Sequence, residues 1–175
     1  MILLHVAAFA LYAVAAWALW PGSGAAVFLR RALPPAALAA HALAAITGVA
    51  TPDGLDLSLP HALSLVAGLT VLVAWATGAL ASLPGVGAVV LPVAALAALL
   101  PAAFASPHRF PYAGAPWAAA HIAVALLAYA FFVVAAAQAL VMTGLESRLH
   151  RGLAEGSAAP PLLTLERALF RLILA

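Results

Sequence analysis

Histidine is the residue type best able to do chemistry in this sequence, which contains no cysteine and few acidic residues. The six histidines are His5, His41, His61, His108, His121 and His150. A neutral imidazole is a common axial ligand of haem iron, which takes ligands on opposite faces of the porphyrin. An imidazole inside a membrane can also relay protons. Haem binding and proton transfer are therefore the two chemistries that these residues could serve.

The patterns that mark common enzyme sites are absent from the sequence. It has no paired carboxylates, no phosphate-binding glycine loop, no Ser-His-Asp pattern and no HExxH helix. Without cysteine, the chain also lacks thiol nucleophiles, thiolate metal ligands and a disulfide framework. We therefore expect a protein that is not an enzyme.

The segments that carry the histidines are strongly apolar. Apolar residues make up 67% of the chain and charged residues only 7%, and the mean hydropathy is +1.17. Because a soluble domain carries about 25% charged residues, this chain could not cover a water-facing surface. Its length of 175 residues indicates one domain, residues 1–175. The composition therefore predicts a polytopic membrane protein with the lipid bilayer as its main partner.

Five stretches are long enough to cross a hydrocarbon core of about 30 Å, which takes about 20 helical residues. They cover residues 2–20, 34–50, 60–80, 86–105 and 117–143. The first has no basic segment before it, so we interpret it as a retained span and not as a signal peptide. Leu162–Ala175 is apolar but too short to span. The expected fold is an all-α transmembrane bundle of five full spans plus the start of a sixth, truncated at its C-terminus.

The arginines predict the orientation of the spans. Most of them fall in the first, third and fifth connections between spans. The second and fourth connections hold only Arg109. The positive-inside rule then places the N-terminus outside a bacterial inner membrane and the Glu146–Pro161 loop in the cytoplasm. The basic character of the chain thus reflects topology, and we expect no nucleic-acid partner.

In this topology His5, His61, His108 and His121 lie toward the outer face, whereas His41 lies deeper. The first three could simply be interfacial residues. A buried His41 needs a hydrogen-bond partner, and it could be either a ligand or a packing residue. His121 opens the longest span, and Tyr129 lies eight residues further on roughly the same side of the helix. For His121, too, a ligand role and a structural role both remain open.

The stretch from His121 to Phe132 reads HIAVALLAYAFF. It resembles the His-x7-Tyr-Ala stretch of the cytochrome c assembly (CcsA/HemX) membrane family, most closely its YpjD-like inner-membrane branch. Three further pieces agree in order and spacing with that family: His41-Ala-Leu, the segment from Leu57 to Val66, and the segment from Pro160 to Phe170.

This resemblance implies a haem-handling or cytochrome c maturation protein, with His121 at the position of a haem ligand at the outer end of its helix. His41, His61 and His5 are the candidate partners for the second ligand, and Tyr129 is a candidate member of the site. Cytochrome c maturation proteins or other membrane proteins are the implied partners. Family members usually have more spans, and the tryptophan-rich outer segment of the haem-ligating members would lie beyond Ala175.

Three functions are compatible with these observations. The chain could hold or pass haem at the outer face, with His121 as ligand. It could instead be a cofactor-free accessory or scaffold subunit that binds another membrane protein through its helix faces. A transporter component with His41 as proton relay is less well supported, because the spans offer no charged residue to pair with His41.

Overall fold

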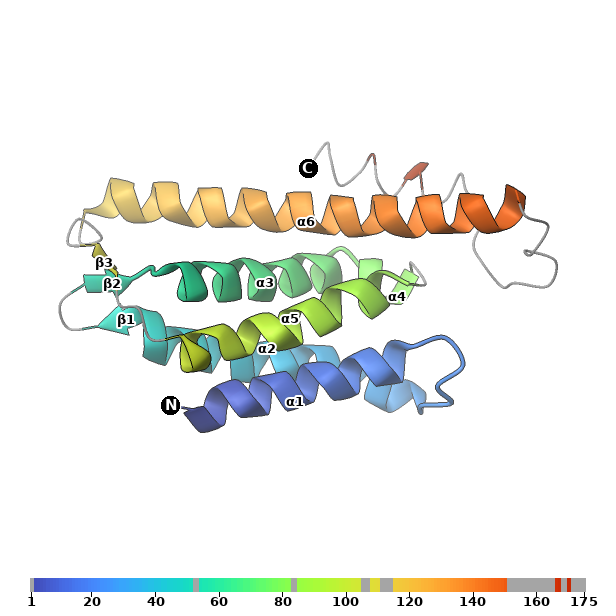
Figure 1. Ribbon diagram of the computed structural model, residues 1–175, viewed down its shortest axis with the longest axis horizontal. Coiled ribbons are helices and arrows are strands. Elements are labelled where there is room, and N and C mark those ends of the chain that lie inside the picture. The colour runs from blue at the N-terminus through green and yellow to red at the C-terminus, as the bar shows by residue number, and fades with distance from the viewer. Residues whose placement is uncertain are drawn as a thin grey trace.

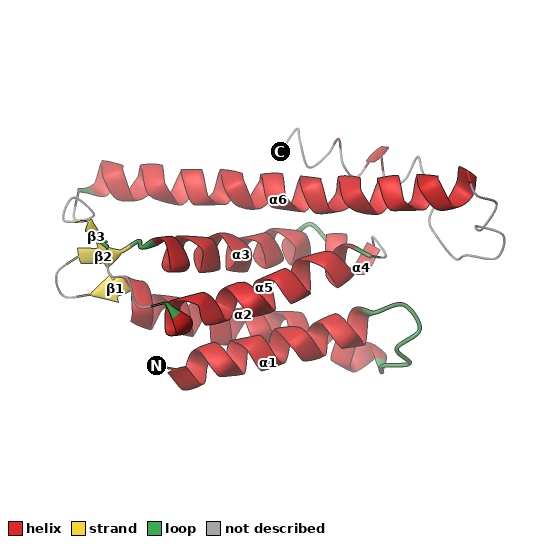
Figure 2. Cartoon of the chain, viewed as in Figure 1, coloured by secondary structure: helices red, strands yellow, loops and turns green. Residues whose placement is uncertain are grey.

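The protein is a helical bundle with a small sheet at one end (Figures 1 and 2). The computed structural model describes residues 2–51, 54–82, 85–104, 108–110 and 115–150, together with Glu166, Arg167 and Phe170. The helices are α1 (Ile2–Leu19), α2 (Val27–Val49), α3 (Leu59–Ala76), α4 (Ala79–Ser82), α5 (Val86–Ala103) and α6 (Pro116–His150). The strands are β1 (Ala50–Thr51), β2 (Gly54–Asp56) and β3 (Arg109–Phe110).

The five longer helices confirm the prediction of a multi-span membrane bundle. Each is long and apolar enough to cross a membrane, and successive long helices run in opposite directions (Figure 1). Inside a bilayer the backbone must satisfy its own hydrogen bonds, which a helix does within one segment. An apolar chain rich in alanine and leucine therefore forms helices there, even though no helix shows a clearly polar face.

The helices pack through small side chains. α1 lies against α2 and α5, and α3 contacts α2, α5 and α6. The fully buried positions include many alanines, among them Ala8, Ala15, Ala37, Ala74 and Ala98. Small residues let helix backbones approach closely, which favours dispersion contacts in a membrane. Tyr12, Leu91 and Gln138 are the largest side chains that are fully enclosed.

The sheet lies where α2 and α5 end and α3 and α6 begin. Its strand order is β1-β2-β3, and both pairs are antiparallel. Leu55 is opposite Ala50 on one side and Phe110 on the other. The prediction placed Ala50 at the end of the second span and the other residues of these strands in loops. Strands of two or three residues are too short for the alternating pattern that identifies a strand in a sequence.

Several helix ends differ from the predicted ones. α2 begins at Val27 and contains Pro34 within it, because a membrane helix tolerates proline where neighbouring groups satisfy the freed carbonyl. α3 ends at Ala76, and Gly78 then adopts a positive φ of 73° before α4. α6 continues past Gly144 to His150. Apart from Glu166, Arg167 and Phe170, the predicted sixth span and most of the predicted cytoplasmic loop lie outside the described residues.

Candidate functional site

A buried polar group in the described core is centred on His41. The Nδ1 atom of His41 lies 3.2 Å from the Tyr12 hydroxyl, and its Nε2 atom lies 2.8 Å from the Ser64 hydroxyl. All three side chains are buried, His41 with 3% of its surface exposed. A neutral imidazole has one donor and one acceptor nitrogen, and each hydroxyl can take the complementary role. We call Tyr12, His41 and Ser64 the His41 hub; it joins α1, α2 and α3.

Ring packing fixes the orientation of His41 as well. The Tyr12 and His41 rings meet edge to face, with centroids 5.6 Å apart and planes at 81°. A Cβ atom added to Gly68 on α3 would lie 3.2 Å from Cε1 and Nδ1 of His41. Because both ring nitrogens are hydrogen-bonded and the ring lies against Gly68, His41 could bind iron only if the hub were broken.

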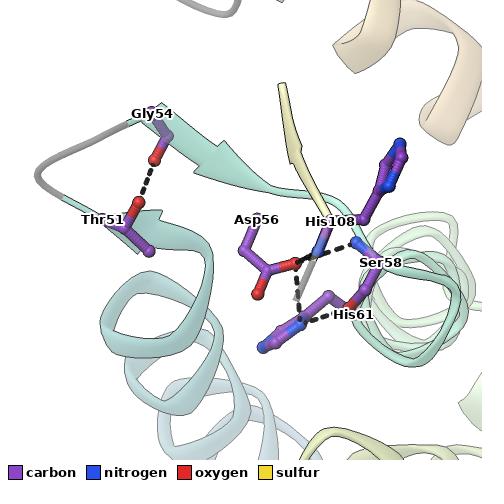
Figure 3. Close-up of polar contacts among 6 residues, drawn as sticks. All are labelled: Thr51, Gly54, Asp56, Ser58, His61 and His108. Atoms are coloured by element: carbon purple, nitrogen blue, oxygen red, sulfur yellow. Dashed lines mark hydrogen bonds and ion pairs between the residues drawn. The ribbon is translucent and has the colours of Figure 1, made fainter. Parts of the chain in front are cut away.

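A second polar group lies at the sheet end of the bundle (Figure 3). The Oδ1 atom of Asp56 accepts the backbone N–H of Ser58 at 3.0 Å and that of His108 at 3.1 Å. The Nδ1 atom of His61 lies 2.9 Å from the Ser58 hydroxyl and 3.7 Å from Asp56 Oδ1. We call Asp56, Ser58, His61 and the backbone of His108 the sheet-end cluster. It links β2, the start of α3 and the segment before β3.

Asp56 is charged in this cluster although only 8% of its surface is exposed. Burial raises the pKa of its carboxyl. The backbone N–H groups of Ser58 and His108, the Ser58 hydroxyl and the neighbouring His61 lower that pKa by more. The pKa of Asp56 therefore lies below its ordinary value, and the carboxylate accepts hydrogen bonds from two separate segments.

His5 is also bonded. Its Nδ1 atom lies 2.8 Å from the carbonyl oxygen of Ala98 on α5, and the side chain is buried in α1. A carbonyl oxygen only accepts, so Nδ1 carries the proton and donates it. His5 therefore ties α1 to α5 near the end of the bundle that carries the sheet (Figure 1).

His121 and Tyr129 lie on the surface of α6. Both side chains are exposed, Tyr129 by 62%, whereas Ala130 and Val134 form part of the buried side of the same helix. In the described part of the chain, no hydrogen bond joins His121 to His41 or His61. The structure therefore gives His41 and His61 each a hydroxyl partner of its own. It leaves His121 and Tyr129 exposed on the surface of α6.

Two observations bear on whether haem fits these residues. Among the described residues, no group of three or more histidine, cysteine, aspartate or glutamate side chains could hold a metal ion. His121 is exposed, and Trp117, one helical turn before it, is 87% exposed. Around His121 the described residues therefore offer one exposed imidazole and, beside it, the apolar surface of Trp117 for a porphyrin.

The sequence analysis missed the partners of His41 and the role of Asp56. Tyr12 and Ser64 come from other spans, and nothing in a helix that is apolar all round shows which side faces a neighbour. One signal was present: His41 precedes Gly48 by seven residues, and His61 precedes Gly68 by seven residues. That spacing places each histidine and its glycine on one side of a helix.

Comparisons with protein-family models, curated proteins and solved structures give no match for this chain. Its classification therefore rests on its own composition and geometry. The chain is a multi-pass membrane protein with five helices long and apolar enough to span a bilayer. Within the described residues, the His41 hub and the sheet-end cluster are two groups of hydrogen-bonded polar side chains.

Proposed function

We propose that this chain is a haem-handling protein of a bacterial inner membrane, in which His121 binds haem iron at the outer face. The observation that carries the proposal is the contrast among the histidines. His5, His41 and His61 each have a hydrogen-bonded ring nitrogen, whereas His121 is exposed on α6. The resemblance of the His121–Phe132 stretch to cytochrome c assembly proteins also supports His121 as the haem ligand.

The distribution of arginines supports an outward-facing His121. Arg30 and Arg31 are exposed near the start of α2, at the end of the bundle opposite the sheet (Figure 1). His121 lies in the first two turns of α6, close to the sheet end. Because arginines favour the cytoplasmic side, the sheet end and the N-terminus face outward in this proposal.

The residues around His121 suit holding haem without catalysis. Bound haem would supply an iron that takes an axial nitrogen ligand, and His121 is the residue that would offer it. The indole of Trp117 and the side chain of Val124, both exposed, would provide apolar contact for the porphyrin. An open surface of this kind favours holding haem for transfer to a cytochrome c maturation partner, and it needs no catalytic residue.

The test is a visible absorption spectrum of the detergent-purified full chain, co-expressed with ample haem. We expect a Soret band that survives purification and shrinks in a His121→Ala variant. A His108→Ala variant is the matched control, because His108 is also exposed at the sheet end and should leave the band unchanged. A folded protein without a Soret band, or an equal band in His121→Ala, would overturn the proposal.

A scaffold role is the second candidate, and the position of Tyr129 favours it. Along α6, Tyr129 is about 18 Å from Trp117 and about 18 Å from Val141, at 1.5 Å per residue; Val141 packs against Gly85 at the start of α5. The exposed hydroxyl therefore lies near mid-membrane. A hydroxyl without a partner costs about 1–3 kcal/mol in protein interiors, which favours a neighbouring helix at this face.

Single cysteines distinguish these two roles, since the chain has no native cysteine. A fluorescent label on Tyr129→Cys in native membranes would be shielded from a lipid-soluble quencher if another protein covers α6. The control is Val93→Cys on the exposed side of α5. Equal quenching at both positions would show that lipid covers α6 and would remove the scaffold proposal.

The third candidate, a transporter, has the least support. Beyond the His41 hub, toward the arginine end, the described core contains the buried polar side chains of Thr70 and Gln138 among apolar residues such as Ala37 and Val71. Neither Thr70 nor Gln138 is ionisable, and the Thr70 hydroxyl donates to the carbonyl of Val66 within α3. A proton relay across the membrane usually uses ionisable groups, which are rare inside membrane spans.

A further inference from the structure

Helices α2 and α3 meet through two reciprocal histidine–glycine contacts. His41 of α2 lies against Gly68 of α3, where an added Cβ atom would be 3.2 Å from the ring. His61 of α3 lies against Gly48 of α2, where an added Cβ atom would be 2.9 Å from Nε2. The two helices are antiparallel. On each helix the histidine precedes the glycine of that same helix by seven residues, so the two contacts lie about 10 Å apart along the hairpin.

The inner contact is held without charge. The groups that face His41 are Tyr12 from α1 and Ser64 and Gly68 from α3, with His5 further along α1. None of them is a carboxylate, and an imidazolium in the membrane interior without a counter-charge is costly. The neutral ring already bonds to two hydroxyls, which makes this contact a fixed point between three helices.

The outer contact has a different electrostatic environment. Asp56 from β2 lies 3.7 Å from His61 Nδ1, and Ser58 lies beside the same nitrogen. On the other side of the ring is Gly48, in the last turn of α2, where the helix dipole is negative. The carboxylate and the helix end both favour a positive charge on the ring.

Two further titratable or charged residues belong to this region. His108 contributes its backbone N–H to Asp56, while its imidazole is exposed and points away from the carboxylate (Figure 3). Arg109 stands opposite Asp56 in the pairing of β2 with β3.

We propose that protonation of His61 forms an ion pair with Asp56 that stabilises the sheet end of the bundle; we call this ion pair the latch. The His41 hub holds α2 and α3 together at a second point of the hairpin. The proton comes from solvent at the sheet end. In the protonated ring, Nδ1–H is directed to Ser58 and Asp56, and Nε2–H faces the carboxyl end of α2. In the neutral ring the ion pair is lost and only the contact with Ser58 remains.

Closing the latch also holds the connection that leads into α6. Asp56 binds the backbone of His108, and the His108 carbonyl accepts the N–H of Leu57 at 3.1 Å. The sheet end is therefore held more tightly when His61 is protonated than when its ring is neutral. The latch is lost again only in stronger acid, where Asp56, whose pKa is lowered, takes up a proton.

The test is amide hydrogen exchange of the full chain in lipid nanodiscs between about pH 5.5 and 8, corrected for intrinsic rates. The reporters are the amides of Ser58 and His108, which both donate to Asp56. The side chains of His61 and Asp56 are 14% and 11% exposed, so the pair keeps some contact with solvent. We expect protection to rise about fivefold at the lower pH, the change that about 1 kcal/mol from an ion pair produces. Corrected protection in the unaltered chain that stays the same across this range would overturn the proposal.

Two variants assign the effect to His61. His61→Gln removes the ionisable ring and should abolish the pH dependence, whereas His108→Gln keeps its backbone donor and should retain it. Gly48→Ala should also weaken the dependence, because its methyl group displaces the ring while leaving the histidine in place. A pH dependence in His61→Gln equal to that of the unaltered chain would assign the protonation to another group and reject the latch.

Discussion

At the scale of single residues, His41 joins three helices of the bundle interior through its bonds to Tyr12 and Ser64. Replacing it with alanine leaves a void and removes the hydrogen-bond partner of both Tyr12 and Ser64. We expect His41→Ala to reduce the free energy of unfolding by roughly 2–4 kcal/mol, measured by reversible unfolding in mixed micelles. Ser64→Ala removes one bond and should cost about 1 kcal/mol. Equal stability of His41→Ala and the unaltered chain would show that the hub does not hold the helices.

Gly68 provides a second test of the hub. Its substitution by alanine places a methyl group 3.2 Å from the His41 ring, and two hydrogen bonds prevent that ring from moving aside. We expect a loss of about 1–3 kcal/mol from overpacking. Gly144→Ala is the control, since Gly144 is also helical and an added Cβ atom there meets nothing within 4 Å. The control should be neutral or slightly stabilising, and a similar loss in both variants would contradict the contact.

Asp56 gives the fold a dependence on acid. Its pKa is lowered in the folded chain, so its contribution to stability is complete above the unfolded-state pKa and is lost as the pH falls through the folded-state pKa. We expect the unfolding temperature to fall on acidification through this range and to fall less in Asp56→Asn. The measurement is thermal unfolding in nanodiscs at a series of acidic pH values. An identical acid profile in both proteins would exclude this role.

At the scale of elements, α6 has two unlike sides. Ala130 is fully buried, whereas Ala136 is exposed. A leucine at position 130 would be forced into the packed side of the helix and should cost about 1–3 kcal/mol. The same change at position 136 adds apolar surface toward lipid or a partner and should be nearly neutral. Unfolding in mixed micelles compares the stabilities of Ala130→Leu and Ala136→Leu. A larger loss in Ala136→Leu would show that position 136, and not position 130, faces the packed side of α6.

The elements also show how far the sequence could predict the fold. The five spans follow from composition and length alone, because a long apolar segment in lipid has no alternative to the helix. The start of α2 at Val27 did not follow, since Pro34 and Pro35 were interpreted as its beginning. The strands around Leu55 and Phe110 were missed because two or three residues carry no period.

The site was less predictable than the fold. The histidines could be singled out by residue type, and the greater depth of His41 in the bundle followed from its place in the second span. Their contacts could not, because Tyr12 and His41 are far apart in sequence and meet only when α1 packs against α2. Helices that are apolar on every side do not record which neighbour each side meets.

At the scale of the whole molecule, the two ends of the bundle differ in character. The sheet end carries Asp56 and His61, and the opposite end carries Arg30 and Arg31. We expect His108→Cys in intact cells to react with a membrane-impermeant maleimide, and Ser23→Cys to react only after permeabilisation. The absence of native cysteine removes background labelling. The opposite pattern would place His121 at the cytoplasmic face and reverse the proposed orientation.

The proposal that His121 binds haem is tested most directly by titrating haem into the apo-protein while following tryptophan fluorescence. Trp117 lies one helical turn from His121 and is exposed, so haem bound there should quench its emission. We predict saturable quenching with one haem per chain, at least about tenfold weaker binding in His121→Ala, equivalent to about 1.4 kcal/mol, and a much smaller signal in Trp117→Phe. Equal affinity in His121→Ala and the unaltered chain would contradict the assignment of His121 as the ligand.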